Sequence, residues 1–168
     1  IEVIHPSDVP RFRALGVLPV MQPIHADPGT VEVWSKAVGA ERVKMAFAWK
    51  AFLNAGARLT FSSDWPACIS LNPIRGLHNA VNRQTTTGHP PGGWQPQHRV
   101  SVEEALTAYT RSAAYASFEE ERKGQLAPGM LADLIVLDRN PLRIPARELH
   151  TLRVEKTIFD GRVVYEKK

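Results

Sequence analysis

The sequence contains a single cysteine and no long hydrophobic run. Cys68 stands alone, which excludes a disulfide within the chain and fits a reducing compartment. No apolar stretch approaches the roughly 20 residues that a membrane-spanning helix needs, and the chain's beginning lacks the basic and apolar regions of a signal peptide. We therefore expect a soluble, cytoplasmic protein with no membrane partner. Because the sequence starts with Ile1 and not with Met, a targeting signal further upstream stays open.

The sequence also lacks a strong imbalance of charge. Its 21 Lys and Arg residues are scattered among 17 Asp and Glu residues, and the formal net charge is +4. No basic block or aromatic-basic stripe of the kind that binds nucleic acid is present, so we expect no nucleic-acid partner. The 168 residues, 43% of them hydrophobic, suffice for one ordinary core or for a core with a small appendage.

The first third of the chain alternates between helical and extended patterns. Residues 8–15 predict a short helix, and residues 17–21 form an apolar run that predicts a buried strand, in which Pro19 favours a strand end. A wide apolar stripe over residues 41–55 predicts a longer helix. The run that starts at residues 59–61 predicts a second strand. The order strand, helix, strand is typical of a parallel sheet covered by helices.

The middle of the chain is rich in proline and glycine. Residues 72–99 predict a long loop that begins with a short helix over residues 74–82. Ser101 and Glu104 have the spacing of a capping box, which predicts the start of a further helix. A second helical piece is expected over residues 112–118.

The pattern changes near residue 119 from helices to short strands separated by turn residues. The expected strands are residues 132–137, 157–159 and 162–165. Asp160-Gly161 between the last two is a strong hairpin signal. We therefore expect two units, residues 1–118 and residues 119–168.

Asp64 ends the apolar run of the second predicted strand. A buried strand would there deliver one carboxylate to an open rim, which is how barrel enzymes expose a metal ligand or a general base. A catalytic metal normally needs about three protein ligands, and no second ligand cluster stands beside Asp64 in the sequence. A helix cap or turn residue is the alternative, and position alone does not separate the two.

Several phrases along the chain carry a family resemblance. They include Met21-Gln-Pro-Ile-His25, Ser63-Asp-Trp-Pro66, Pro90-Pro-Gly-Gly-Trp94 and the run from Lys123-Gly to Ala132-Asp133. In combination they resemble the amidohydrolase superfamily, and within it the amidohydrolase family 3 group, over nearly the whole chain. The resemblance implies an α/β fold: the C-terminal part of a (β/α)8 TIM barrel, followed by a small β-sandwich segment.

The resemblance also implies a chemistry. Members of this family are metal-dependent hydrolases in which a metal-bound hydroxide attacks an amide, an ester or a related carbonyl. It implies a divalent metal, with zinc expected, and a small amide-type or ester-type substrate. Carried over by position, Asp64 is the metal ligand and the catalytic proton acceptor. His25, Trp65 and Trp94 are candidate substrate contacts, although a solvated His and ordinary Trp packing are the alternatives.

The chain departs from the family pattern because the family's paired His-x-His and its other ligand positions have no counterpart here. The remaining histidines are dispersed, and we expect His78, His89, His98 and His150 on the surface. By the resemblance, His5 stands where the family often has a His that is not a ligand. Arg75 and Arg83 could bind an anionic group of a substrate, but their spacing does not separate them from surface arginines. Cys68 could be a nucleophile, but we expect a small buried apolar residue.

The sequence therefore supports two hypotheses. The first is a fragment of an amidohydrolase that acts on non-peptide carbon-nitrogen bonds, inactive by itself and without a bound metal until a missing N-terminal portion or self-association completes it. The second is a non-catalytic assembly module derived from such an enzyme. A complete barrel takes about 250 residues, so under either hypothesis the barrel strands need partners that this sequence does not contain.

Overall fold

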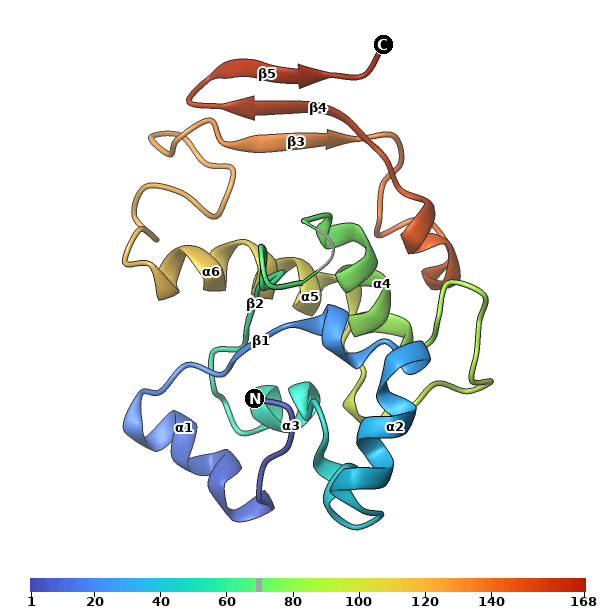
Figure 1. Cartoon of the computed structure of the whole chain (residues 1–168). Coiled ribbons are helices and arrows are strands. Elements are labelled where there is room, and N and C mark those ends of the chain that lie inside the picture. Colours follow the sequence, from blue (N-terminus) through green and yellow to red (C-terminus); the bar gives the residue numbers. More distant parts are fainter. Residues whose placement is uncertain (69–70) are drawn as a thin grey trace.

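The computed structural model describes residues 1–68 and 71–168 and shows a mixed α/β fold (Figure 1). The α-helices are α1 (Val9–Leu15), α2 (Pro28–Val38), α3 (Trp49–Asn54), α4 (Pro73–Asn82), α5 (Val102–Tyr109) and α6 (Arg111–Ala116). The strands are β1 (Val20–Met21), β2 (Thr60–Phe61), β3 (Leu134–Leu137), β4 (Val154–Phe159) and β5 (Arg162–Glu166). Short 3-10 turns lie at Pro6–Asp8, Pro23–Ala26, Arg42–Met45, Pro96–His98 and Ala146–Thr151. Within the described residues, no helix combines the length and the hydropathy needed to cross a membrane.

Strands β1 and β2 form the parallel pair that the sequence predicts. Val20 lies opposite Thr60 and Met21 opposite Phe61. The first strand is shorter than expected, because the predicted run 17–21 pairs only at its end and Val17 is 48% exposed. Pro19 has no N–H to donate, and it joins the pair only by accepting a hydrogen bond from the Thr60 amide at 3.1 Å.

The prediction of a continuous helix over residues 41–55 is wrong. The structure has a 3-10 turn at Arg42–Met45, an extended Ala46, and Phe47 at a φ of 49° before α3 begins. A helix would use the carbonyls of Ala46 and Phe47 for its own ladder. Here both accept hydrogen bonds from the Arg83 guanidinium, at 3.2 and 3.3 Å, so a distant side chain replaces the local pattern.

Other helix boundaries follow their sequence signals. The Ser101 hydroxyl accepts from the Glu104 amide at 3.1 Å, and the Glu104 carboxylate accepts from the Ser101 amide at 2.7 Å, which confirms the capping box at the start of α5. Helix α4 matches the short helix expected over residues 74–82. Helix α2 was missed; Asp27 caps it by accepting from the Gly29 amide at 2.9 Å.

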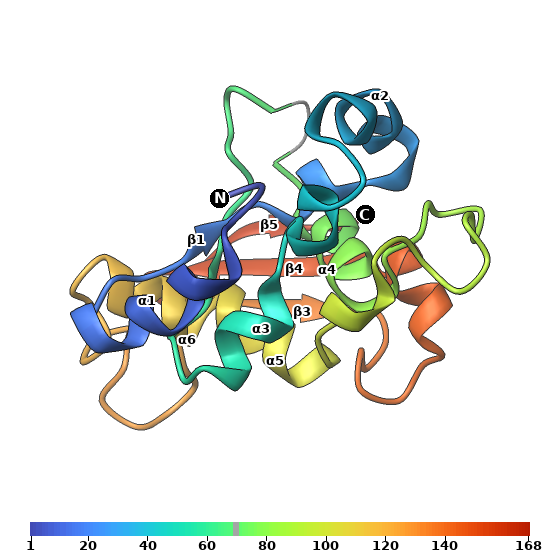
Figure 2. The ribbon, with the colours of Figure 1, turned by 90° about the horizontal axis from the view of Figure 1, so that it is seen from below.

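The C-terminal strands form one antiparallel sheet in the order β3-β4-β5. Asp160 and Gly161 join β4 to β5 with φ values of 50° and 72°, and positive values at both positions suit a tight hairpin turn, as predicted. The sheet lies at one end of the molecule, at the top of Figure 1, and behind the helical part in Figure 2. Every residue of β5 is exposed, including Val163, Val164 and Tyr165.

The core lies in the helical part around β1 and β2. Its largest fully buried apolar side chains include Met21, Trp49, Phe52 and Phe61. The rings meet edge to face or tilted, with the Trp49 and Phe61 centroids 5.4 Å apart. Such pairs contribute stability beyond the apolar area that they bury. The hydrophobic core therefore holds the two parallel strands in place, and their carboxyl ends lead into the loops that carry the candidate site.

Arg83 is fully buried, which corrects the expectation of a surface arginine. It follows α4 at a φ of 54° and donates to three carbonyls, those of Ala46, Phe47 and Trp94. Its guanidinium also lies 4.5 Å from the ring centre of Trp49 and 4.8 Å from that of Trp94. Among the described residues its hydrogen-bond acceptors are these three carbonyls, and none is a carboxylate.

Burial lowers the pKa of Arg83 to about 9, and the nearby charge of Arg99 adds to the shift. The guanidinium thus stays protonated at pH 7. It is held by carbonyl dipoles and two indole faces instead of by an opposite charge.

We expect Arg83→Lys to lower the free energy of unfolding by at least about 3 kcal/mol, because a lysine cannot reach three carbonyls at once and each stranded group costs about 1–3 kcal/mol. Urea unfolding measures the change. Arg147→Lys, at an exposed position, is the matched control and should leave stability within about 0.5 kcal/mol. Equal stability of the two variants would contradict the role given to Arg83.

Two histidines expected on the surface, His78 and His98, are also buried. The His78 Nε2 faces the Thr85 carbonyl at 3.2 Å and its Nδ1 accepts from the Asn82 amide at 3.1 Å. The His98 Nε2 donates to the Lys44 carbonyl at 2.9 Å. Burial lowers the pKa of both imidazoles, so both are neutral in the fold.

Stability should therefore fall as the pH drops through about 6.5. The unfolded chain takes up protons on these two histidines near that pH, whereas the folded chain binds them only at lower pH, so acid favours the unfolded state. Urea unfolding between pH 7.5 and pH 5 measures this slope. His98→Gln keeps a donor for the Lys44 carbonyl and should reduce the loss, whereas His89→Gln at an exposed loop position should not.

Candidate functional site

The carboxyl ends of β1 and β2 place His25 and Asp64 at the same edge of the parallel pair. His25 lies in the 3-10 turn that follows β1, and Asp64 lies in the loop that follows β2. Parallel strands end on the same side, so residues 39 positions apart meet there, and Nε2 of His25 lies 3.3 Å from Oδ2 of Asp64. The predicted exposed carboxylate is thus 45% exposed and faces a histidine.

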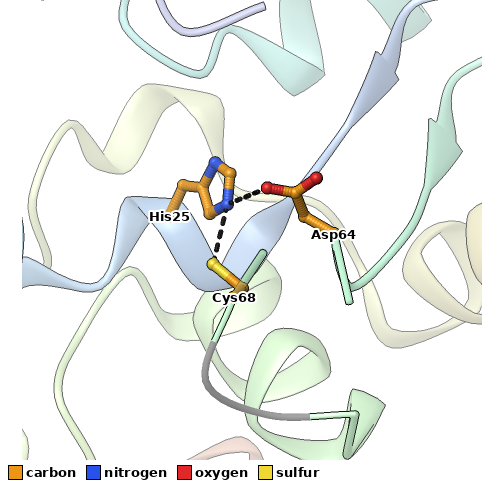
Figure 3. Close-up of side chains that lie close together, drawn as sticks. All are labelled: His25, Asp64 and Cys68. Atoms are coloured by element: carbon orange, nitrogen blue, oxygen red, sulfur yellow. Dashed lines mark hydrogen bonds and ion pairs between the residues drawn. The ribbon is translucent and has the colours of Figure 1, made fainter. Parts of the chain in front are cut away.

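Cys68 is the third member of this cluster, as Figure 3 shows. Asp64 has a φ of 60°, and its carbonyl accepts from the Cys68 amide at 2.9 Å, which folds the loop back on itself. The sulfur then lies 3.0 Å from Nε2 of His25. The expectation of a buried apolar cysteine is wrong, because Cys68 is only partly buried and faces two polar side chains.

His25, Asp64 and Cys68 present one nitrogen, one oxygen and one sulfur to a common space. The three atoms lie within 4.8 Å of one another. Imidazole nitrogen, carboxylate oxygen and thiolate sulfur are the donor types that zinc binds in proteins. The donor set therefore fits a divalent metal such as zinc, the group that the sequence resemblance implies.

A carboxylate lies on the other side of the His25 ring. Oε1 of Glu2 is 3.6 Å from Nδ1, which is within ion-pair distance. His25 therefore has a carboxylate within ion-pair distance of each ring nitrogen, Glu2 at Nδ1 and Asp64 at Nε2. Glu2 had no assigned role in the sequence, and only the fold brings it here.

The two candidate tryptophans lie in different surroundings. Trp65 directly follows Asp64 and is 59% exposed. Trp94 packs against Trp34 and Phe47, with centroid distances of 6.3 and 6.1 Å, and against Arg83. The structure therefore brings Trp65, but not Trp94, next to the three-donor cluster.

Polar contacts also tie the two loops together beneath the cluster. The Gln22 amide donates to the hydroxyl of Ser62 at 2.9 Å, and so links the ends of β1 and β2. Arg75 donates twice to the buried carboxylate of Asp27, at 2.8 and 3.2 Å. This arginine thereby supports the start of α2.

Comparisons with known proteins agree with the residue phrases. The profile of the amidohydrolase family matches residues 1–165. Protein LONG AFTER FAR-RED 3 of Arabidopsis thaliana is 37% identical over 139 residues, which cover 80% of this chain and 23% of that protein. N-substituted formamide deformylase of Arthrobacter pascens is 34% identical over 148 residues, which cover 84% of this chain and 26% of that enzyme.

A solved structure is similar as well. An uncharacterized metal-dependent hydrolase from Pyrococcus horikoshii OT3 matches with a TM-score of 0.72 and 29% identity, over 86% of this chain and 29% of its own. The chain spans about a quarter of the length of the first curated relatives it matches. With a profile match over nearly its whole length, this chain belongs to the amidohydrolase family.

Proposed function

We propose that the chain is the C-terminal part of a metal-dependent amidohydrolase that cleaves non-peptide carbon-nitrogen bonds. Residues 1–118 would supply the last strands and helices of a (β/α)8 barrel, and residues 119–168 would supply part of a small β-sandwich. The observation that carries the proposal is the placement of Asp64 at the carboxyl end of a parallel strand, because active sites of such barrels are built at that face.

The open surfaces of the chain support a larger assembly. β1 and β2 pair only with each other among the described residues, so each has an unpaired outer edge. The β3-β4-β5 sheet exposes Ile135, Phe159, Val163 and Val164. Unpaired edges and exposed apolar faces of this kind are normally covered by further chain.

The proposed reaction assigns the proton to Asp64. A divalent metal, with zinc expected, would supply activated water when bound by Asp64 and by residues outside this chain. The Asp64 carboxylate takes a proton from that water and returns it to the leaving nitrogen as the carbon-nitrogen bond breaks. Its exposed position leaves room for a substrate carbonyl in front of it.

The proposed substrate is a small amide, and carbon-nitrogen cleavage is in keeping with the name of the N-substituted formamide deformylase. His25 and Trp65 flank Asp64, so they are the proposed substrate contacts, with the exposed Trp65 ring available to an apolar substituent. We assign Trp94 to packing, because it contacts Trp34, Phe47 and Arg83.

In the longer protein that contains this chain, Asp64→Asn should lower kcat by at least about 100-fold, since it removes the proton acceptor. Hydrolysis of an N-substituted formamide and of related amides measures the change. Asp8→Asn is the matched control, because the Asp8 side chain is 41% exposed and makes only a local ion pair with Arg11. Unchanged turnover in Asp64→Asn would contradict the catalytic role proposed for Asp64.

The exposed apolar sheet favours a second candidate function, that of a non-catalytic assembly module. Turnover that survives Asp64→Asn together with an altered oligomer size would support it. Both candidates predict that the 168-residue chain associates with itself when it is produced alone, because β5 is exposed and, among the described residues, β1 and β2 have no further strand partner.

Size-exclusion chromatography with light scattering tests that association. The double variant Val163→Lys and Val164→Lys places a charge on each face of β5 and should reduce it, because successive side chains of a strand point to opposite faces. A monodisperse monomer with a cooperative melt in the unmodified chain would contradict the expectation.

A further inference from the structure

We propose that His25, Asp64 and Cys68 form a cation site within this chain, with Cys68 as a thiolate ligand and Glu2 as the residue that orients His25. The inference rests on the proposed function for the role of Asp64, adds two ligands from this chain, and makes His25 a ligand in place of a substrate contact. Neither His25 nor Cys68 was a predicted ligand in the sequence. Only the geometry of the loops after β1 and β2 brings them together.

The distances fit a small cation. With bonds of about 2.0 Å to nitrogen and oxygen and about 2.3 Å to sulfur, tetrahedral ligands lie about 3.3–3.6 Å from one another. The Nε2–Oδ2 separation is 3.3 Å and the Nε2–Sγ separation is 3.0 Å. The third separation, Oδ2 to Sγ, lies within 4.8 Å, so small shifts of the Asp64 and Cys68 side chains would bring all three donors to these distances.

The charges around the cluster suit a cation. Glu2 and Asp64 bring two carboxylates within ion-pair distance of the His25 ring. Cys68, as a thiolate ligand, would give up its proton. One cation would satisfy all three groups, and its binding would release that proton to solvent.

Glu2 provides the kind of outer support that metal-binding histidines have. The second ring nitrogen of such a histidine almost always faces a carboxylate, a carbonyl or water, which fixes the ring and raises its basicity. Here the Glu2 carboxylate lies 3.6 Å from Nδ1, within ion-pair distance, while Nε2 faces the donors. Glu2 and His25 would therefore act as the supporting carboxylate and the imidazole ligand of a cation bound at the cluster.

The ligand chemistry also sets the preferred ion. Thiolate sulfur and imidazole nitrogen favour zinc and cobalt, whereas magnesium prefers oxygen ligands. Asp64 is 45% exposed, so a fourth position open to water or substrate is available on the solvent side.

Titration of the 168-residue chain with Co²⁺ tests the site. We expect one equivalent to bind with a sulfur-to-cobalt charge-transfer band, and Cys68→Ser should abolish that band. His25→Ala should lower the affinity for Co²⁺ at least tenfold, and Glu2→Gln should lower it about 10–100-fold. His89→Ala and Glu103→Gln, at exposed positions, are matched controls, and circular dichroism checks that each variant is folded.

Thiol reactivity gives a second measurement. Because Cys68 is the only cysteine, its alkylation rate reports on this site alone. Zn²⁺ should slow alkylation at least tenfold, and Mg²⁺ should not. Should the isolated chain aggregate, the Co²⁺ titration in the longer protein replaces it, and the band must still depend on Cys68.

Cobalt binding without the sulfur band, or an alkylation rate that zinc leaves unchanged, would overturn the inference. The two proposals fail separately. A missing band with turnover that still requires Asp64 removes the Cys68 site and leaves the proposed function. A Cys68-dependent band together with turnover that does not require Asp64 removes the proposed function and leaves the Cys68 site.

Discussion

The parallel pairing of β1 with β2 is the constraint on which the candidate site depends. Each strand is two residues long, yet the pairing sets the direction in which both loops leave the sheet. Because of it His25 and Asp64 meet, and the loop that turns back through the Cys68 amide completes the cluster. A shift of register by one residue would turn the buried Met21 and Phe61 to the other face and separate these loops.

The helical part is held together around a second, unusual interaction. Arg83 lies without a carboxylate partner among the described residues, and three carbonyl dipoles and two indole rings stabilise its charge. It joins the end of α4 to the turn before α3 and to the loop that carries Trp94. Burying a charge is costly, so this network is stable only while every donor is satisfied. This network also supports the candidate site, because α3 packs in the same core as β2, the strand that leads to Asp64.

Local sequence signals predicted much of the fold. The Ser101 capping box and the Gly161 hairpin are formed by residues close in sequence, so propensity and turn chemistry sufficed. The helix across Phe47 failed because Arg83, distant in sequence, binds its carbonyl, and no local pattern records that contact. In the site, Asp64 was accessible to prediction because a strand end carries a recognisable phrase. The position of Cys68 depends on the turn after Asp64 and was not.

The distribution of the four tryptophans has an optical consequence. Trp49 is fully buried beside a cation, and Trp34 and Trp94 belong to the same aromatic cluster, whereas Trp65 is 59% exposed. Indole emission from the cluster reports on the interior, while an aqueous quencher reaches Trp65 first. Intrinsic tryptophan fluorescence can therefore give two signals without an added dye: emission of the buried indoles for unfolding, and quenching of Trp65 for changes beside Asp64.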